Sequence, residues 1–216
     1  MNKKVGAHLL GIITVVMIMS SCTKDYSYSH DSSYFGKGYY FKGKIFGQDK
    51  LFKDGVNSFF NDFRNGYDPG WTHGYTEFGI AKPAPSQPGD ELIYVAAASE
   101  GVTSARDVNK YLMIGKQPFY MTNVRGGLGV TYFLNDSTGT KGCAECSVQR
   151  VFTTLGAQDG MTIEVLSIQP IDNAPVNGSQ KFEIAVRFNC KLYDLNGNYV
   201  GNIQNGLLVS QVLVAI

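Results

Sequence analysis

Hydrophobic and polar residues alternate along much of the chain beyond residue 38, and a period of two is typical of strands with one buried face. The clearest run is 182–193, where every even position is apolar and most odd positions are polar. Shorter runs predict strands over 39–46, 92–98, 129–134, 148–153, 162–168 and 206–214. The stretch 194–198 has the composition of a turn and is predicted to join the last two strands.

Two stretches show the spacing of a short helix instead. The first has apolar residues at i, i+3, i+4 and i+7, although these bulky side chains also suit a strand: Val56, Phe59, Phe60 and Phe63. The second begins at Ser104, which is a good N-cap supported by Asp107, and ends before Gly115 and Pro118. Its apolar stripe consists of Val108, Tyr111 and Leu112.

The predicted strands far outnumber the helices. The sequence therefore predicts one antiparallel β-sandwich domain over residues 38–216, with a closed β-barrel as the alternative. The 216 residues are 44% hydrophobic and 12% aromatic, which is sufficient for a substantial core. The formal net charge is +1 and no dense run of Lys and Arg occurs, so nucleic acid is excluded as an expected partner.

The N-terminus has the features of a lipoprotein signal peptide. Positive charges at Lys3 and Lys4 precede an apolar run over 9–19, which is too short to span a bilayer comfortably. The run ends in Met19-Ser20-Ser21-Cys22, which resembles the bacterial lipobox. We therefore expect residues 1–21 to be cleaved and Cys22 to carry the lipid that anchors the protein to a membrane. An ordinary secretory signal with a chance cysteine is the alternative.

Residues 22–37 are polar and rich in Ser and Tyr, and they are predicted to form a flexible tether. Lys24 and Asp25 resemble a weak surface-export signal, which favours the cell surface over a periplasm-facing anchor. Three features together make the chain resemble small Bacteroidota-type outer-membrane lipoproteins: the lipobox, the aromatic stretch 40–47, and the stretch 187–194 before an Asn-Gly turn. The resemblance implies an outer-membrane location and a mostly β domain, and it assigns no catalytic or binding residues.

Three cysteines follow Cys22. A disulfide between Cys190 and either Cys143 or Cys146 is the preferred interpretation, because the cell envelope permits disulfides. Unpaired structural thiols are an alternative. The Cys-x-x-Cys spacing of Cys143 and Cys146 also suits a metal or redox site, but the further ligands that a metal would need, such as His30 or His73, are not marked by any second motif. The sequence predicts no metal site and no cofactor.

A candidate ligand platform lies in the Gly-flanked aromatic stretch 69–75. Trp71 and Tyr75 offer flat apolar faces for a sugar ring, and His73 offers hydrogen bonds to its hydroxyl groups. A Trp71 that fills the core is the alternative. The glycine-rich stretch 123–129 matches no phosphate-binding motif and is predicted to form a bend or bulge before a strand.

Catalytic motifs are absent from the sequence. A glycosidase needs two carboxylates across a cleft, but the spacing of the candidate acids singles out no pair: Glu77, Asp90, Glu91 and Glu164. Asp136-Ser137-Thr138 resembles a three-residue O-glycosylation site, with Ser137 as the acceptor.

Together these observations predict a lipid-anchored envelope protein that acts as a non-catalytic binding module. The expected ligand is a glycan or a partner envelope protein. A structural or assembly subunit of a surface complex is the first alternative, and an enzyme acting on polysaccharide is the second.

Overall fold

The computed structural model describes residues 32–68, 73–82, 90–100, 105–121, 126–136, 148–171 and 178–215. Several predictions therefore concern residues outside the described part, among them the signal peptide over 1–21, the lipid anchor at Cys22, and Trp71, Cys143, Cys146 and Ser137. The predicted tether, 22–37, is described only at its end, where η1 (Ser32–Tyr34) forms one short 3-10 turn.

Strands dominate the described chain. They are β1 (Tyr40–Ile45), β2 (Gln48–Lys53), β3 (Phe60–Asp68), β4 (His73–Ala81), β5 (Glu91–Glu100), β6 (Gly115–Gln117), β7 (Gly126–Asp136), β8 (Val148–Thr153), β9 (Thr162–Pro170), β10 (Ser179–Tyr193) and β11 (Tyr199–Ala215). Every pairing between these strands is antiparallel. The strands predicted from alternating residues are all present, most of them with longer bounds, and the mostly β prediction is confirmed.

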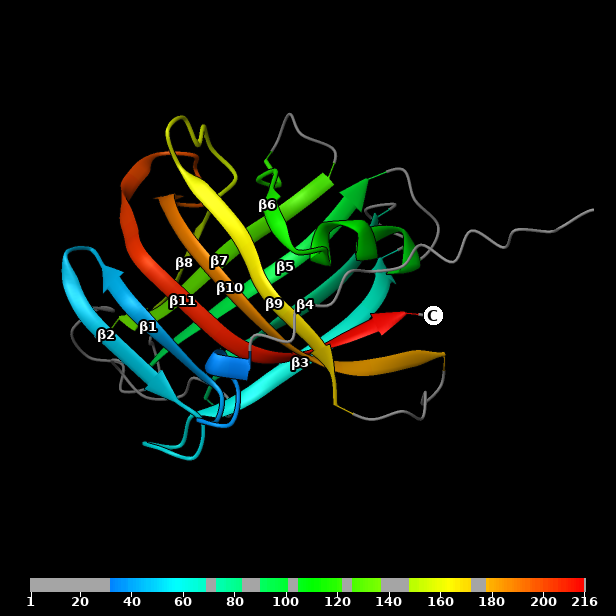
Figure 1. Cartoon of the computed structure of the whole chain (residues 1–216). Coiled ribbons are helices and arrows are strands. Elements are labelled where there is room, and N and C mark those ends of the chain that lie inside the picture. The colour runs from blue at the N-terminus through cyan, green and yellow to red at the C-terminus, as the bar shows by residue number, and fades with distance from the viewer. Residues whose placement is uncertain are drawn as a thin grey trace, which may run out of the picture.

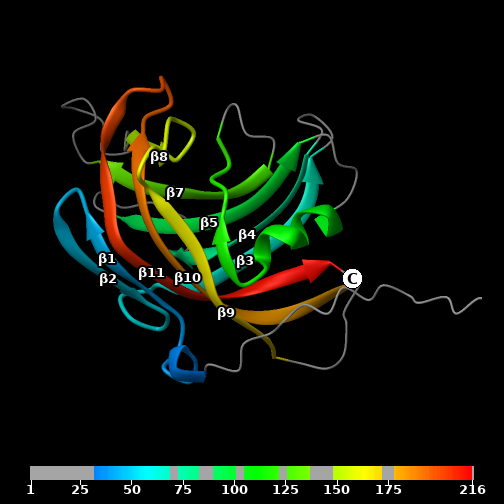
Figure 2. The ribbon, with the colours of Figure 1, turned by 45° about the horizontal axis from the view of Figure 1, so that its top comes forward.

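The strands form one sheet that folds into two facing layers (Figures 1 and 2). One layer contains β2, β1, β11, β10, β9 and β6, and the other contains β8, β7, β5, β4 and β3. The layers are continuous where Tyr193 of β10 pairs with Thr153 of β8. Among the described strands no pairing joins β2 to β3, so the sheet stays open. This arrangement is consistent with the predicted β-sandwich, and the β-barrel alternative is wrong.

The helix predicted over 56–63 is wrong, because the chain makes a tight turn there and then enters β3. Asn57 and Ser58 both have positive φ angles, 51° and 61°, which no helix accommodates. Phe59 is buried and stacks on Phe52 with ring centroids 4.9 Å apart, while Phe60 is exposed. The apolar residues at helical spacing thus belong to a turn and a strand.

The second predicted helix is confirmed as the 3-10 helix η2 (Ala105–Leu112), which lies at one end of the sandwich (Figure 1). Val108 and Leu112 are buried in the core, as the apolar stripe predicts, and Tyr111 packs against it. The helix ends at Leu112, and Gly115, the first residue of β6, has a φ of 111°, a conformation that favours glycine. No helix in the described part of the chain is long and apolar enough to cross a membrane.

The core lies between the two layers and is rich in aromatic rings. Phe41 and Phe188 come from one layer, Phe78 and Tyr132 from the other, and all four are at most 1% exposed. The β1–β2 hairpin closes over one end of this core through Phe46, whose ring contacts Phe152 edge-on at 5.3 Å. Burial on this scale is the main contribution that holds the layers together.

Candidate functional site

Small side chains cover part of the outward face of the layer that contains β5 and β7. On β5, Ile93, Val95 and Ala97 are fully buried in the core. The alternate residues, Ala96 and Ala98, face away from the core because successive side chains on a strand point to opposite faces. Ala96 pairs in register with Gly129 of β7, which has no side chain at all. The result is a low floor on the surface of the sheet.

A groove of about 400 Å³ lies over this floor. Its walls come from β3, β4, the segment after β6 and the chain after β8. The lining residues are Arg64, Tyr75, Glu77, Ala96, Ala98, Tyr120, Gly129, Val130, Thr131, Thr153, Thr154 and Leu155. Both this volume and the mixture of apolar surface with a few polar groups are typical of a site for a small ligand.

The aromatic wall on one side of the groove is Tyr75 of β4. Tyr75 pairs in register with Gly66 of the neighbouring strand β3. A Cβ atom at Gly66 would lie 3.0 Å from the Tyr75 hydroxyl oxygen and 3.2 Å from its Cζ, so the ring occupies the space above the glycine. The absence of a side chain at Gly66 therefore lets the Tyr75 ring lie over the sheet while it borders the groove.

The charged wall is an ion pair between Arg64 of β3 and Glu77 of β4, which also pair in register. Arg64 Nε donates to Glu77 Oε2 at 2.7 Å, and Arg64 Nη2 approaches the same oxygen at 2.6 Å. The hydrogen bond and the charge of Glu77 raise the pKa of Arg64. Glu77 Oε1 has no partner among the described residues, and the Arg64 side chain is 63% exposed. The pair thus keeps both an acceptor and several donors for a ligand.

Tyr120 lines the groove from the segment between β6 and β7. Its backbone N–H donates to the Leu128 carbonyl at 2.9 Å, which fixes the segment against β7. The Tyr120 hydroxyl donates to Glu100 Oε1 at 3.3 Å, and burial together with the negative charge of Glu100 raises the pKa of Tyr120. A Cβ atom at Gly127 would overlap the Pro118 carbonyl oxygen. The described end of the glycine-rich stretch, Gly126–Gly129, lies inside β7 and pairs with β5 without a register shift, so the bend or bulge predicted there is wrong; Gly127 instead allows the close approach of the segment at Pro118.

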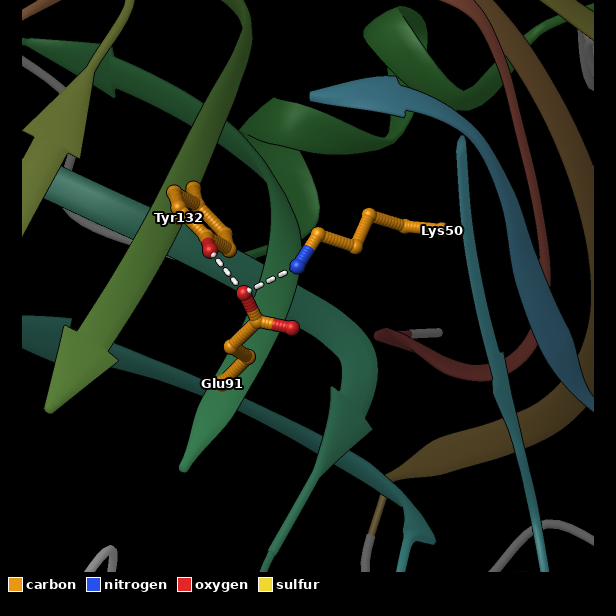
Figure 3. A network of polar contacts seen from close by, with 3 residues as sticks. All are labelled: Lys50, Glu91 and Tyr132. Atoms are coloured by element: carbon orange, nitrogen blue, oxygen red, sulfur yellow. Dashed lines mark hydrogen bonds and ion pairs between the residues drawn. The ribbon is translucent and has the colours of Figure 1, made fainter. Parts of the chain in front are cut away.

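The other candidate acids lie in separate contacts rather than across a cleft from Glu77. Glu91 Oε1 accepts a hydrogen bond from the Tyr132 hydroxyl at 2.6 Å and contacts Lys50 Nζ at 2.7 Å (Figure 3). Since Lys50 lies on β2 and Glu91 on β5, this network ties the two layers together. Asp90 forms an ion pair with Lys82 at 2.8 Å.

Glu164 of β9 pairs in register with Arg187 of β10 and belongs to the other layer. Within the ranges that the structure describes, no group of three His, Cys, Asp or Glu side chains is placed to hold a metal ion.

Of the predicted ligand platform, Tyr75 lies at the groove. His73 is the first residue of β4 and pairs in register with Asp68 and Glu100, but its side chain and all of Trp71 lie outside the described part. Cys190 is fully buried and has no disulfide partner among the described residues; burial raises the pKa of its thiol. Its pairing with Cys143 or Cys146 stays a prediction.

Sequence reasoning missed Arg64 and Tyr120 as groove residues. Arg64 and Glu77 are 13 positions apart, and only the register of β3 with β4 brings them together. Oppositely charged residues at matched positions of two adjacent strands are the one signal that could have indicated this pair. Nothing in the sequence marks Tyr120, because its position depends on how the chain packs after η2.

Comparison with known proteins adds no relative to this description: the chain has no significant match to a protein family, to a curated protein or to a solved structure. The fold class and the groove thus rest on the chain's own sequence and geometry.

Proposed function

We propose that this protein is a lipid-anchored protein of the bacterial cell envelope that binds a glycan in the groove and catalyses no reaction. The observation that carries this proposal is the composition of the groove. It combines the Tyr75 ring, a floor of Ala96, Ala98 and Gly129, and the Arg64–Glu77 pair with an unused carboxylate oxygen.

Each part of the groove suits one feature of a sugar. An aromatic ring packs well against the C–H groups of a pyranose, and its apolar area contributes most of the binding free energy. A guanidinium group beside a carboxylate offers donors and an acceptor to neighbouring hydroxyl groups, each of which both donates and accepts. The small floor residues leave room for the ring, which larger side chains would fill.

The chemistry of the groove favours binding over hydrolysis. A glycosidase uses two carboxylates about 5 to 10 Å apart on opposite sides of the scissile bond. Glu77 is the only acid among the described lining residues, and its Oε2 atom is held by Arg64. The groove thus lacks, in its described part, the second carboxylate that an enzyme of this class requires.

A glycan array with the full chain in detergent tests the proposal. We expect saturable binding that Arg64→Ala weakens about tenfold, the effect of losing roughly 1.4 kcal/mol of charge-assisted hydrogen bonding. Arg187→Ala is the matched control, because it removes an exposed arginine from the other layer. Equal losses in both variants, or no saturable binding to any glycan, would reject the groove as a glycan site and would favour the role in envelope assembly.

The anchor is tested separately. If Cys22 carries the lipid, Cys22→Ala should move the protein from the detergent-extracted membrane fraction to the soluble fraction. Protease treatment of intact cells would then distinguish the proposed surface location, in which the wild type is digested, from a periplasm-facing anchor, in which it is protected. Retention of Cys22→Ala in the membrane fraction would reject the lipid anchor without affecting the groove.

A further inference from the structure

A second hollow lies on the other layer of the sandwich, where β11 departs from regular pairing. Phe188 of β10 pairs with Gly206 of β11, but Cys190 pairs with Ile203. Two steps along β10 thus correspond to three along β11, which defines a β-bulge. Asn205 in the bulge has a φ of 50°, and its N–H donates to Asn189 Oδ1 at 2.8 Å. The bulge is therefore held in place by the side chain of the neighbouring strand.

The bulge changes which side chains reach the surface. In a regular strand Gln204 and Asn205 would point to opposite faces, but here both are exposed. They border a hollow of about 470 Å³, which we call the amide hollow. Its lining residues are Gly160, Met161, Thr162, Asn189, Asn202, Ile203, Gln204 and Asn205. Four of these eight residues have amide side chains, and none of the eight carries a charge.

The hydrogen bonds of the amide hollow leave several groups available. Asn202 Oδ1 accepts from the Tyr199 hydroxyl at 3.0 Å, but the Asn202 Nδ2 group has no partner within the described ranges. The Gln204 side chain forms no hydrogen bond with any described residue. Tyr199 is 57% exposed, so an aromatic ring stands beside the amides. The same kinds of group occur in the groove, with amides in place of the ion pair.

We propose that the amide hollow is a second binding site, and that its ligand is a neutral saccharide. Amides donate and accept without charge, which matches the hydroxyl groups of a sugar. A charged ligand would lose water and gain no counter-charge from the lining residues, which is costly. A peptide bound as an added strand is disfavoured, because β11 is already paired with β1 on one side and β10 on the other.

The site does not depend on the groove. The amide hollow lies on the layer of β9, β10 and β11, and the groove lies on the layer of β3, β4, β5, β7 and β8. Two saccharide sites on separate layers would let one molecule hold two chains, or two stretches of one chain. Binding would then be tighter to polysaccharides than to short oligosaccharides, because a chain bound at one site is held at a high effective concentration near the other.

The test is calorimetric titration of the full chain in detergent with a panel of neutral gluco-, manno-, galacto- and xylo-oligosaccharides. The informative variant is the double substitution Asn202→Ala and Gln204→Ala, which leaves the Asn189–Asn205 hydrogen bond intact. We expect affinity at one site to fall at least about tenfold, as the loss of two neutral hydrogen bonds implies. Gln48→Ala is the matched control, because it removes an exposed amide from the edge strand β2.

Combining the double substitution with Arg64→Ala separates the two sites. Saccharide binding that survives Arg64→Ala and is lost in the double variant supports the amide hollow, whatever the fate of the groove. Binding that the double variant retains in full overturns this proposal and leaves the groove as the glycan site. Absence of saturable binding to every neutral oligosaccharide also overturns it. Thermal unfolding of each variant verifies that the fold is retained.

Discussion

The two outward faces of the sandwich each carry a hollow, but they form it in different ways. In the groove the strands are regular, and space arises because Ala96, Ala98 and Gly129 have little or no side chain. In the amide hollow four of the lining residues carry amide side chains, and the bulge at Asn205 redirects the backbone beside them. One site is thus made by residue size and the other by backbone geometry.

This difference determines how each site tolerates change. A hollow made by small residues is filled by a single larger side chain, while the strands beneath it keep their pairing. A hollow made by a bulge depends on the register of three strands and on the packing below it, where the Phe188 ring lies against Gly206. Substitutions that test the comparison should therefore separate effects on binding from effects on stability.

The largest effect is expected from Phe188→Ala, which removes the ring beneath the bulge. Phe188 is fully buried and stacks on Phe41 at 6.1 Å, so its loss should lower the free energy of unfolding by about 3 to 5 kcal/mol. Urea unfolding measures this. Phe133→Ala is the control on the groove face, where the partly buried ring packs only against a small cluster and leaves no sealed cavity. An equally large loss of unfolding free energy for Phe133→Ala would contradict the idea that the amide hollow depends more on the core beneath it than the groove does.

The positions of the strands could be predicted from the sequence, but their register and the bulge in β11 could not. The alternation over 182–193 depends on local burial alone, and β10 confirms it. Phe59, Phe60 and Phe63 misled because a turn and a strand happened to place them at helical spacing. The Arg64–Glu77 pair needs the register of β3 with β4, and the amide hollow needs one extra residue in β11. Register and bulges are set by contacts between distant segments, which no local pattern records.

A second prediction compares two glycines of the groove layer. A Cβ atom at Gly79 would overlap the Ile93 carbonyl oxygen, which is backbone and cannot move alone, so Gly79→Ala should cost about 1 to 3 kcal/mol of stability. At Gly129 the nearest atom, Thr154 Oγ1, is 3.5 Å away. Gly129→Ala should therefore leave the urea midpoint nearly unchanged and weaken glycan binding by filling the floor. Equal losses of stability for Gly79→Ala and Gly129→Ala would show that the groove floor has no more room for a side chain than Gly79 has.

A third prediction concerns the network that ties the layers together. Glu91→Gln removes the negative charge that Lys50 and Tyr132 share, and we expect it to lower stability by about 1 to 2 kcal/mol. Glu183→Gln is the matched control, since the donors to Glu183 among the described residues are both neutral, the Tyr39 hydroxyl and the Gln169 amide. Urea unfolding at low and high salt should show a salt-dependent difference for Glu91→Gln alone. Identical behaviour of both variants would show that Lys50 contributes nothing.

The smallest effect is expected at the turn that leads from β10 into β11 and so toward the bulge. Asp194 accepts hydrogen bonds from the Asn198 backbone N–H at 2.8 Å, from the Asn198 side chain at 3.1 Å and from the Asn196 backbone N–H at 2.9 Å, and these bonds lower the pKa of Asp194 below its ordinary value of 3.8. A pKa that is lower in the folded state gives a contribution that is complete above the unfolded pKa and is lost as the pH falls through the folded pKa. Acidification below about pH 4 should therefore destabilise the wild type slightly more than Asp194→Asn.

Urea midpoints at neutral and acidic pH measure that difference, and Asp159→Asn, at an exposed acid before β9, is the control. If the turn sets the register of the bulged strands, the wild type at acidic pH should also lose saccharide affinity at the amide hollow before it loses affinity at the groove. The Asp194–Asn198 contacts lie on the chain that enters β11, whereas β3, β4, β5 and β7 pair with neither β10 nor β11. Parallel loss of affinity at both sites would mean that the register of β11 depends on the core beneath it rather than on its turn.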